Sequence, residues 1–261
     1  MLVLLSPAKS LDYESRVTTR KSSQPRMLDE AERLIDVMRR KSPDEVAELM
    51  DISDDLAVLN VERYADFSPP FTRRNARPAV LAFAGDVYQG MNARERFDER
   101  DFTEAQKSVR VLSGLYGVLR PLDLIQPYRL EMGIRLHTER GSSLYEWWGD
   151  QVRDQLLADL AESPGAQVIV NCASGEYARA ARLETVDVPV ISPRFEDADP
   201  KGRYRIVSFF AKRARGDFAA WMVQNRVRTP GALKRFDGNG YRYSAERSTA
   251  TEPVFVRDRA G

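Results

Sequence analysis

Polar side chains that could take part in chemistry gather at the ends of four apolar segments of the chain. The segments and the polar residues that follow them are 1–5 with Lys9, 79–83 with Asp86, 168–170 with 171–177, and 204–208 with 212–215. If the four segments are parallel strands, their carboxyl ends meet at one edge of a sheet, where α/β proteins bind ligands. The sequence therefore predicts one polar cleft, although strand ends also carry polar turns for structural reasons alone.

Asp86 and Glu176 are the candidate general acid and base of such a cleft, because a carboxyl group can exchange a proton with a bound nucleotide. Asn171, Ser174 and Tyr177 lie close to Glu176 in the sequence and complete the set of candidate catalytic residues. The one histidine of the chain lies in a polar stretch without a matching motif, so a Ser-His-Asp hydrolase is not expected.

A cluster of cations, Lys212, Arg213 and Arg215, stands in the first turns of the helix expected after residue 208. Cations oppose the dipole at this end of a helix, whereas its free N–H groups attract anions. Lys212 and Arg215 are three residues apart and share a face of the helix. The cluster therefore indicates a phosphate site; a solvated basic turn paired with nearby carboxylates is the structural alternative.

Residues 112–121, LSGLYGVLRP, place Gly114 and Gly117 on either side of two large apolar residues. Such a turn after a helical pattern is similar to a helix-hairpin-helix, whose backbone N–H groups contact DNA phosphates without selecting a sequence. We predict a helix-hairpin-helix-like element over residues 101–125, with Ser113 in its turn and Arg110 and Arg120 flanking it. A strand at 109–112 and a tight turn within the core are the alternatives, and Pro121 restricts any second helix.

The composition excludes several kinds of site. One Cys and one His in 261 residues allow no internal disulfide and none of the common His and Cys sites for zinc or iron, so neither a metal nor a cofactor is expected. Lys and Arg number 40 against 39 Asp and Glu, so any attraction for a polyanion must come from local clusters. No apolar run approaches the roughly 20 residues of a membrane helix, and residues 1–5 do not form a signal peptide. We expect a cytoplasmic protein without a membrane partner. The sequence does not define its oligomeric state.

Elements of both kinds must position these residues. Apolar spacing predicts three helices within 25–65 and one helix over 144–160, with capping boxes starting at Ser42 and Ser143. Weak strand signals at 241–243 and 254–256 follow near the end of the chain. The fold class is therefore α/β (mixed α+β), with a central sheet and flanking helices. Residues 1–261 are expected to form a single compact domain, at the upper end of what one core serves.

Four motifs together identify a resemblance to the YaaA family of peroxide stress proteins. They are SPAKSLD at 6–12, FAGDVY at 83–88, LSGLYGVLRPLDLIQPYRLEMG at 112–133, and SFFAKRARG at 208–216. The resemblance implies a compact α/β fold with a helix-hairpin-helix and a positively charged cleft that binds double-stranded or branched DNA, independently of its sequence. It also implies a role in the hydrogen peroxide response, which limits damage to DNA and protein and lowers the amount of unincorporated iron.

Carried over to this chain, the resemblance places the hairpin at 113–120. The cleft cations that it implies are Lys9, Arg110, Arg120, Lys212, Arg213 and Arg215. The effect on iron is expected to be indirect, because a lone His and a lone Cys make chelation by this chain implausible. DNA binding without catalysis is the favoured hypothesis. The alternative is an enzyme that acts on a nucleotide or nucleic-acid base in the same cleft, taking the base into a pocket.

Overall fold

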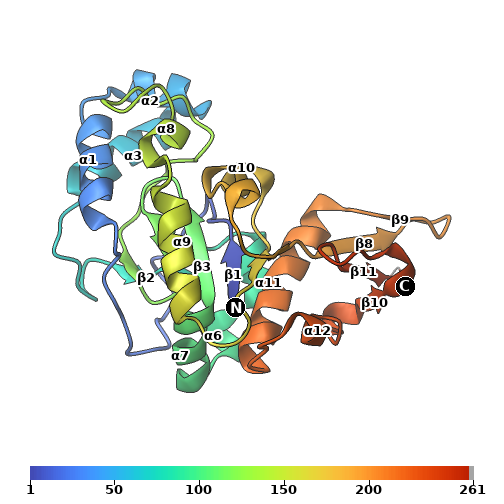
Figure 1. The fold of residues 1–261 in the computed structure, drawn as a ribbon. Helices are drawn as coiled ribbons and strands as arrows, with labels where there is room; N and C mark the ends of the chain where they lie inside the picture. The colour runs from blue at the N-terminus through green and yellow to red at the C-terminus, as the bar shows by residue number, and fades with distance from the viewer. Residues whose placement is uncertain (259–261) are drawn as a thin grey trace.

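A five-stranded sheet lies at the centre of the computed structural model, which describes residues 1–258 (Figure 1). Its strands, in spatial order, are β4 (Gly117–Leu119), β3 (Val109–Ser113), β1 (Leu2–Leu5), β6 (Ile169–Asn171) and β7 (Val190–Ile191). All neighbouring pairs are parallel except β3 with β4. The chain passes from β1 to β3 on one side and later returns to β6 on the other. The strand order therefore reverses at β1, which is where α/β sheets form a ligand crevice.

Helices cover this sheet. The helices α7 (Glu99–Ser108) and α11 (Ser208–Gln224) contact β1, and α9 (Gln151–Glu162) contacts β4. All four residues of β1 are at most 1% exposed, which is why its sequence is an unbroken apolar run without alternation.

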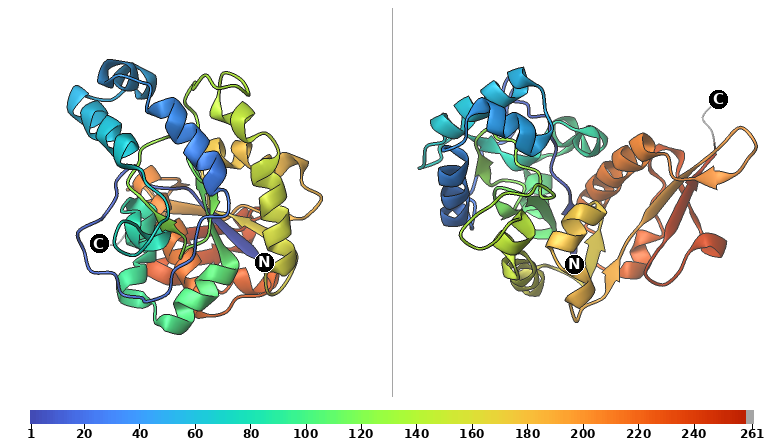
Figure 2. Two further views of the ribbon diagram at one scale, coloured as in Figure 1. Left: turned by 90° about the vertical axis from the view of Figure 1, so that its left-hand side faces the viewer. Right: turned by 90° about the horizontal axis from the view of Figure 1, so that it is seen from above.

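A second sheet of four strands lies on the far side of α11 from the central sheet (Figures 1 and 2). Its order is β10 (Arg242–Ser244), β11 (Val254–Arg257), β8 (Arg194–Ala198) and β9 (Tyr204–Arg205). Phe195, Phe218 and Phe255 pack between this sheet and α11, with ring centroids 5.4–5.7 Å apart. The two strands predicted near the end of the chain are thus confirmed as β10 and β11.

The three helices predicted within 25–65 are present. They are α1 (Leu28–Met38), α2 (Pro43–Met50) and α3 (Asp54–Asp66), coloured blue in Figure 1. Ser42 starts α2 with the predicted capping box, in which its side chain and that of Glu45 bond reciprocally to backbone N–H groups.

The remaining elements are short. They are β2 (Arg77–Pro78), which pairs with β5 (Leu124–Ile125), α4 (Ala79–Ala82), α5 (Asp86–Met91), α6 (Ala93–Arg96), α8 (Leu144–Trp148), α10 (Gly175–Ala180), α12 (Pro230–Leu233), and 3₁₀ turns at Leu183–Thr185, Gly238–Gly240 and Ala245–Arg247. No helix among residues 1–258 combines the length and apolar character needed to cross a membrane.

Three predicted elements need correction. Residues 79–83 begin with the helix α4 rather than forming a strand, because a short buried apolar run has no period that separates the two. The predicted helix over 144–160 is divided into α8 and α9 at Gly149, because its φ of 51° lies outside the range of a right-handed helix. The strand expected over 204–208 ends at Arg205, where the chain turns toward α11.

The helix-hairpin-helix-like element predicted over 101–125 is absent. The helix α7 ends at Ser108, and β3 and β4 follow as an antiparallel hairpin in which Ser113 pairs with Gly117. Gly117 has a φ of 64°, a left-handed conformation that glycine adopts without strain. The two alternatives foreseen are both correct: 109–112 is a strand, and Leu115 and Tyr116 are fully buried in the turn. The α/β class with a central sheet and flanking helices is confirmed, and the assignment of one domain to 1–261 stays a prediction.

Candidate functional site

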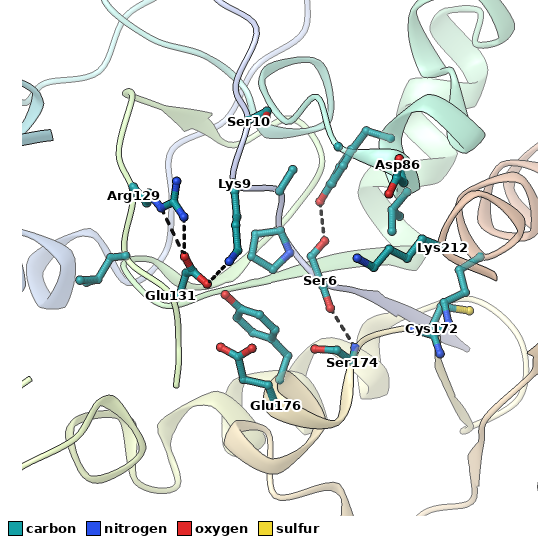
Figure 3. Close-up of a pocket in the computed structure, with 18 of the residues that line it drawn as sticks. Ser6, Lys9, Ser10, Asp86, Arg129, Glu131, Cys172, Ser174, Glu176 and Lys212 are labelled. Carbon is teal, nitrogen blue, oxygen red and sulfur yellow. Dashed lines mark hydrogen bonds and ion pairs between the residues drawn. The ribbon is translucent and has the colours of Figure 1, made fainter. Parts of the chain in front are cut away.

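A cavity of about 380 Å³ opens at the carboxyl ends of β1 and β6 (Figure 3). We call it the first cavity. It is lined by 6–10, 85–88 and 128–131, by Cys172, Ser174, Glu176 and Tyr177, and by Lys212 and Arg215 of α11. The four predicted polar segments do meet at one cavity, but only the first and third follow strands of the central sheet. The second follows α4, and the fourth lies within α11, after β9 of the second sheet.

Two participants differ from the sequence prediction. Asn171 does not line the first cavity; its side-chain oxygen instead accepts a hydrogen bond of 3.0 Å from the backbone N–H of Ala173. Residues 128–131 were not among the candidates, yet they form one wall. Their only signal in the sequence is membership of the long motif at 112–133, since nothing local indicates that they approach β1.

Ser6 joins three of the segments. Its hydroxyl oxygen accepts a 2.8 Å hydrogen bond from the backbone N–H of Ser174, at the start of α10. Its carbonyl accepts a 2.9 Å bond from the Tyr88 hydroxyl, on α5. These bonds fix the turn after β1 relative to two helix starts, and so determine the shape of the first cavity.

The wall formed by α5 and α11 depends on two glycines. A Cβ added at Gly90 would lie 2.0 Å from the carbonyl oxygen of Arg213, and one at Gly216 would lie 1.7 Å from that of Val87. The two helix backbones are thus in direct contact. This close approach brings Asp86 at the start of α5 to the same cavity wall as Lys212.

Charges of both signs face the first cavity, but they are paired differently on its two sides. Glu131 forms ion pairs with Lys9 at 2.7 Å and Arg129 at 3.1 Å, on the side opposite Asp86 and Lys212 (Figure 3). Among the ion pairs within residues 1–258, none involves Lys212. The α11 side therefore offers an uncompensated cation to an anionic ligand.

Glu176 has a backbone partner at the cavity edge. Its carboxylate accepts a 2.8 Å hydrogen bond from the backbone N–H of Gly133, and its side chain is partly exposed. A carboxylate held in this way can accept a further proton or hydrogen bond from a ligand with its other oxygen.

The floor of the first cavity is aromatic and neutral. Burial raises the pKa of Tyr88, Tyr128 and Tyr177 well above the ordinary tyrosine value, so all three stay protonated near neutral pH. Burial also raises the pKa of Cys172 to about 12, against a smaller opposing influence of Arg215. Cys172 is thus a packed apolar side chain and not a reactive thiolate.

The residues expected to contact DNA from the hairpin lie inside the protein. Arg110 is 3% exposed and bonds to the buried carboxylate of Asp159, and burial lowers its pKa to about 9. Ser113 is fully buried, and its hydroxyl accepts hydrogen bonds from the backbone N–H groups of Leu115 and Tyr116 at 3.2 and 3.0 Å. These side chains stabilise the hairpin within the core.

The other hairpin positions are equally engaged. Gly114 and Gly117 are buried, and the side chain of Arg120 bonds to the fully buried Asp123 at 2.8 Å. Lys9, Lys212 and Arg213 are exposed, and Arg215 is partly exposed. Among the predicted cations, those of α11 and Lys9 are therefore the ones that a large ligand can reach.

Exposed apolar side chains surround these cations at the start of α11. Ile206, Phe209 and Phe210 are 52%, 47% and 42% exposed. Together with Lys212 and Arg213 they form what we call the α11 ledge. Its aromatic residues were not predicted as functional. The sequence did contain a signal, because Phe209 and Phe210 are adjacent and neighbouring positions of a helix point in different directions. Both rings therefore cannot join the apolar face of α11 that includes Phe218.

The described residues offer no obvious metal centre. Within residues 1–258, no group of three or more His, Cys, Asp or Glu side chains is arranged to hold a metal ion.

Comparison with known proteins extends along the whole chain. A family model described as peroxide stress protein YaaA matches residues 1–247. A UPF0246 protein of Paraburkholderia phytofirmans is 52% identical over 258 residues, 98% of each chain. UPF0246 proteins of Cellvibrio japonicus and Alcanivorax borkumensis are 50% and 47% identical, covering 99% and 100% of each chain. The matched residues include every part of the first cavity and of the α11 ledge.

Proposed function

Since this chain belongs to the peroxide stress protein YaaA family, we propose that it acts in the peroxide stress response by binding DNA. Its DNA contacts limit peroxide damage to DNA, and damage to protein is reduced in the same response. The fall in unincorporated iron is an indirect effect, because one His and one Cys cannot form the common iron sites that are built from these residues.

The α11 ledge carries the proposal. Lys212 and Arg213 are exposed, adjacent in sequence, and not engaged in any ion pair within residues 1–258. These two unpaired cations match a surface that grips the phosphates of a duplex, and the exposed aromatic rings beside them are unusual on a surface that meets only water. Double-stranded and branched DNA both present closely spaced phosphates, so both are expected ligands.

The test is a titration of fluorescent duplex DNA of two unrelated sequences at several salt concentrations. The variants are Lys212→Glu and Arg213→Glu, with Arg74→Glu as matched control, because Arg74 is also exposed and without an ion pair within residues 1–258. Each ledge reversal should weaken both duplexes alike and reduce the slope of log K against log salt by about 1. Unchanged affinity in both ledge variants would refute this mode of binding.

A second function is favoured by the first cavity itself. Its volume lies within the range of roughly 300–1,000 Å³ typical of small-molecule sites, with an aromatic floor and a few polar groups at its rim. Asp86 and Glu176 on its lining could exchange protons with a nucleotide or base. The alternative proposal is therefore an enzyme acting on a nucleotide or nucleic-acid base in this cavity.

Two variants distinguish catalysis from binding alone. Asp86→Asn and Glu176→Gln remove the acid and base groups while keeping the shape of each side chain, and the glutamine keeps an oxygen that can accept from Gly133. Cells carrying either variant would lose peroxide protection while the purified protein still bound DNA. Full protection with both variants would eliminate the enzymatic proposal.

A further inference from the structure

A second hollow lies on the other side of the contact between α5 and α11. We call it the second groove; its volume is about 510 Å³. Its lining comes from the end of α5, from α6, from α11, from residues 238–241 and from β11; the residues are Gln89, Gly90, Asn92, Arg96, Phe210, Arg213, Ala214, Asp217, Gly238, Asn239, Tyr241 and Arg257. Lys212 lines the first cavity, and the next residue, Arg213, lines the second groove. The α11 ledge therefore runs across the ridge between the two hollows.

The charges of the second groove leave a net positive surface. Asp217, 5% exposed, pairs with Arg96 and accepts a 2.7 Å hydrogen bond from the side chain of Asn239. The guanidinium of Arg257 is already paired with a carboxylate outside the groove, Asp197, at 2.6 Å. Arg213 completes the set without an ion pair within residues 1–258. Its guanidinium is the charge most available to a phosphate.

An aromatic ring is fixed at the mouth of the groove. The guanidinium of Arg257 lies 4.8 Å from the ring centroid of Phe210 and 4.6 Å from that of Tyr241. Phe209 contacts Phe210 edge to face, with centroids 5.6 Å apart. These contacts hold Phe210 in place while 42% of it stays exposed, so the ring can stack on a ligand without first being ordered.

Two amide side chains line the same groove as this ring. Gln89 and Asn92 line the groove, are exposed, and form no side-chain hydrogen bond within residues 1–258. Asn and Gln are the side chains that donate to and accept from the edge of a base in one plane. The guanidinium of Arg213 lies over the ring of Phe209, 5.3 Å from its centroid, and so keeps its charge for a phosphate. A stacking ring, a guanidinium without a carboxylate partner and amides without a side-chain hydrogen bond are together the groups that one nucleotide unit of a strand requires.

We propose that the second groove binds an unpaired base of a DNA strand, stacked on Phe210, with the adjoining phosphate on Arg213. A base inside a duplex is already stacked on both faces, so only a bulged, extruded or single-stranded base can occupy the groove. The inference rests on the proposed function, because it requires DNA at the α11 ledge. It adds a preference for strand defects that phosphate contacts alone do not give.

The experiment compares three probes: a fully paired hairpin duplex, the same duplex with a single bulged 2-aminopurine, and a 12-nucleotide single strand. The variants are Phe210→Ala, the conservative Phe210→Tyr, and Leu59→Ala as an exposed apolar control on α3. Phe210→Ala should weaken the bulged and single-stranded probes about fivefold or more, and leave the paired duplex within about twofold. Phe210→Tyr should restore affinity, and quenching of 2-aminopurine by stacking should follow the same order.

The outcomes separate this inference from the proposed function. Wild-type protein that binds none of the probes at low salt would overturn both. Wild-type protein that binds all probes, with Phe210→Ala affecting none or all equally, would overturn only the second groove as a base site. If a free mononucleotide bound as tightly as the bulged duplex, and its binding depended on Phe210, the ligand of the second groove would be a small molecule and not a DNA strand. Urea unfolding of each variant shows that the changes in affinity do not arise from loss of the fold.

Discussion

The contact between α5 and α11 has no space for a side chain, and Gly216→Ala tests this directly. The added Cβ would lie 1.7 Å from the carbonyl oxygen of Val87 and 2.7 Å from the backbone nitrogen of Met91. Ordinary van der Waals contact begins at about 3.4 Å, twice the first distance. Because the atoms in the way belong to the backbone of α5, no change of rotamer relieves the clash, and the two helices must separate.

The expected cost follows from this geometry. Overpacking of a close-packed interior typically costs about 1–3 kcal/mol. Three backbone atoms of α5 lie within 2.7 Å of the added Cβ, so we expect a cost at the upper end of that range, about 3 kcal/mol. Alanine is favoured over glycine within a helix by about 1 kcal/mol, which offsets part of the clash. We therefore expect Gly216→Ala to lower the free energy of unfolding by about 2 kcal/mol. Native proteins typically have a free energy of unfolding of about 5–15 kcal/mol, so a loss of about 2 kcal/mol leaves the variant folded.

Urea unfolding monitored by tryptophan fluorescence measures this change. Gly231→Ala on α12 is the matched control, since a Cβ there meets no atom within 4 Å and its φ is not in the left-handed region. The control should be neutral or more stable by up to about 1 kcal/mol. If Gly216→Ala proved as stable as Gly231→Ala, the direct backbone contact between the two helices would be wrong.

Three further outcomes follow from buried and hydrogen-bonded groups. Asp159→Asn leaves the buried Arg110 without its carboxylate and should cost about 3–5 kcal/mol in urea unfolding, whereas Asp154→Asn, exposed on the same helix, should cost less than about 1 kcal/mol. Cys172 should react with iodoacetamide at pH of about 8 far more slowly in the native protein than in urea, because burial raises its pKa to about 12; equal rates would contradict its burial. Burial alone would raise the pKa of Asp12, but hydrogen bonds from the Ser15 hydroxyl, two backbone N–H groups and an arginine outweigh it and hold the pKa well below its usual range. Its stabilisation is therefore present above pH of about 4 and is lost as the pH falls below that value, so Asp12→Asn should flatten the acid side of the stability curve, and an unchanged curve would count against these bonds.

Local patterns in the sequence were enough to predict several elements and most of the first cavity. The run LVLL of β1 is apolar at every position because a strand buried on both faces has no polar side, and Ser42 carries its capping partner three residues away. Lys9 and Glu176 were predicted to share a cleft because the carboxyl ends of parallel strands meet at one edge, and they follow the parallel neighbours β1 and β6. Asp86 lines the same cavity but follows the helix α4, so the strand argument does not account for its place.

Only the tertiary structure decided the rest. Residues 109–112 have a pattern that fits a helix or a strand, and their pairing with β1, more than 100 residues away, selects the strand. The sequence predicted that Arg110 contacts DNA. Its hydrogen bond to Asp159, on the distant helix α9, instead makes it part of the core. Phe210 became a candidate for binding only when its exposure and its contact with Arg257 were known. Burial and ion pairing are properties of segments far apart in the chain, so the side chains available to a ligand could not be chosen by local sequence alone.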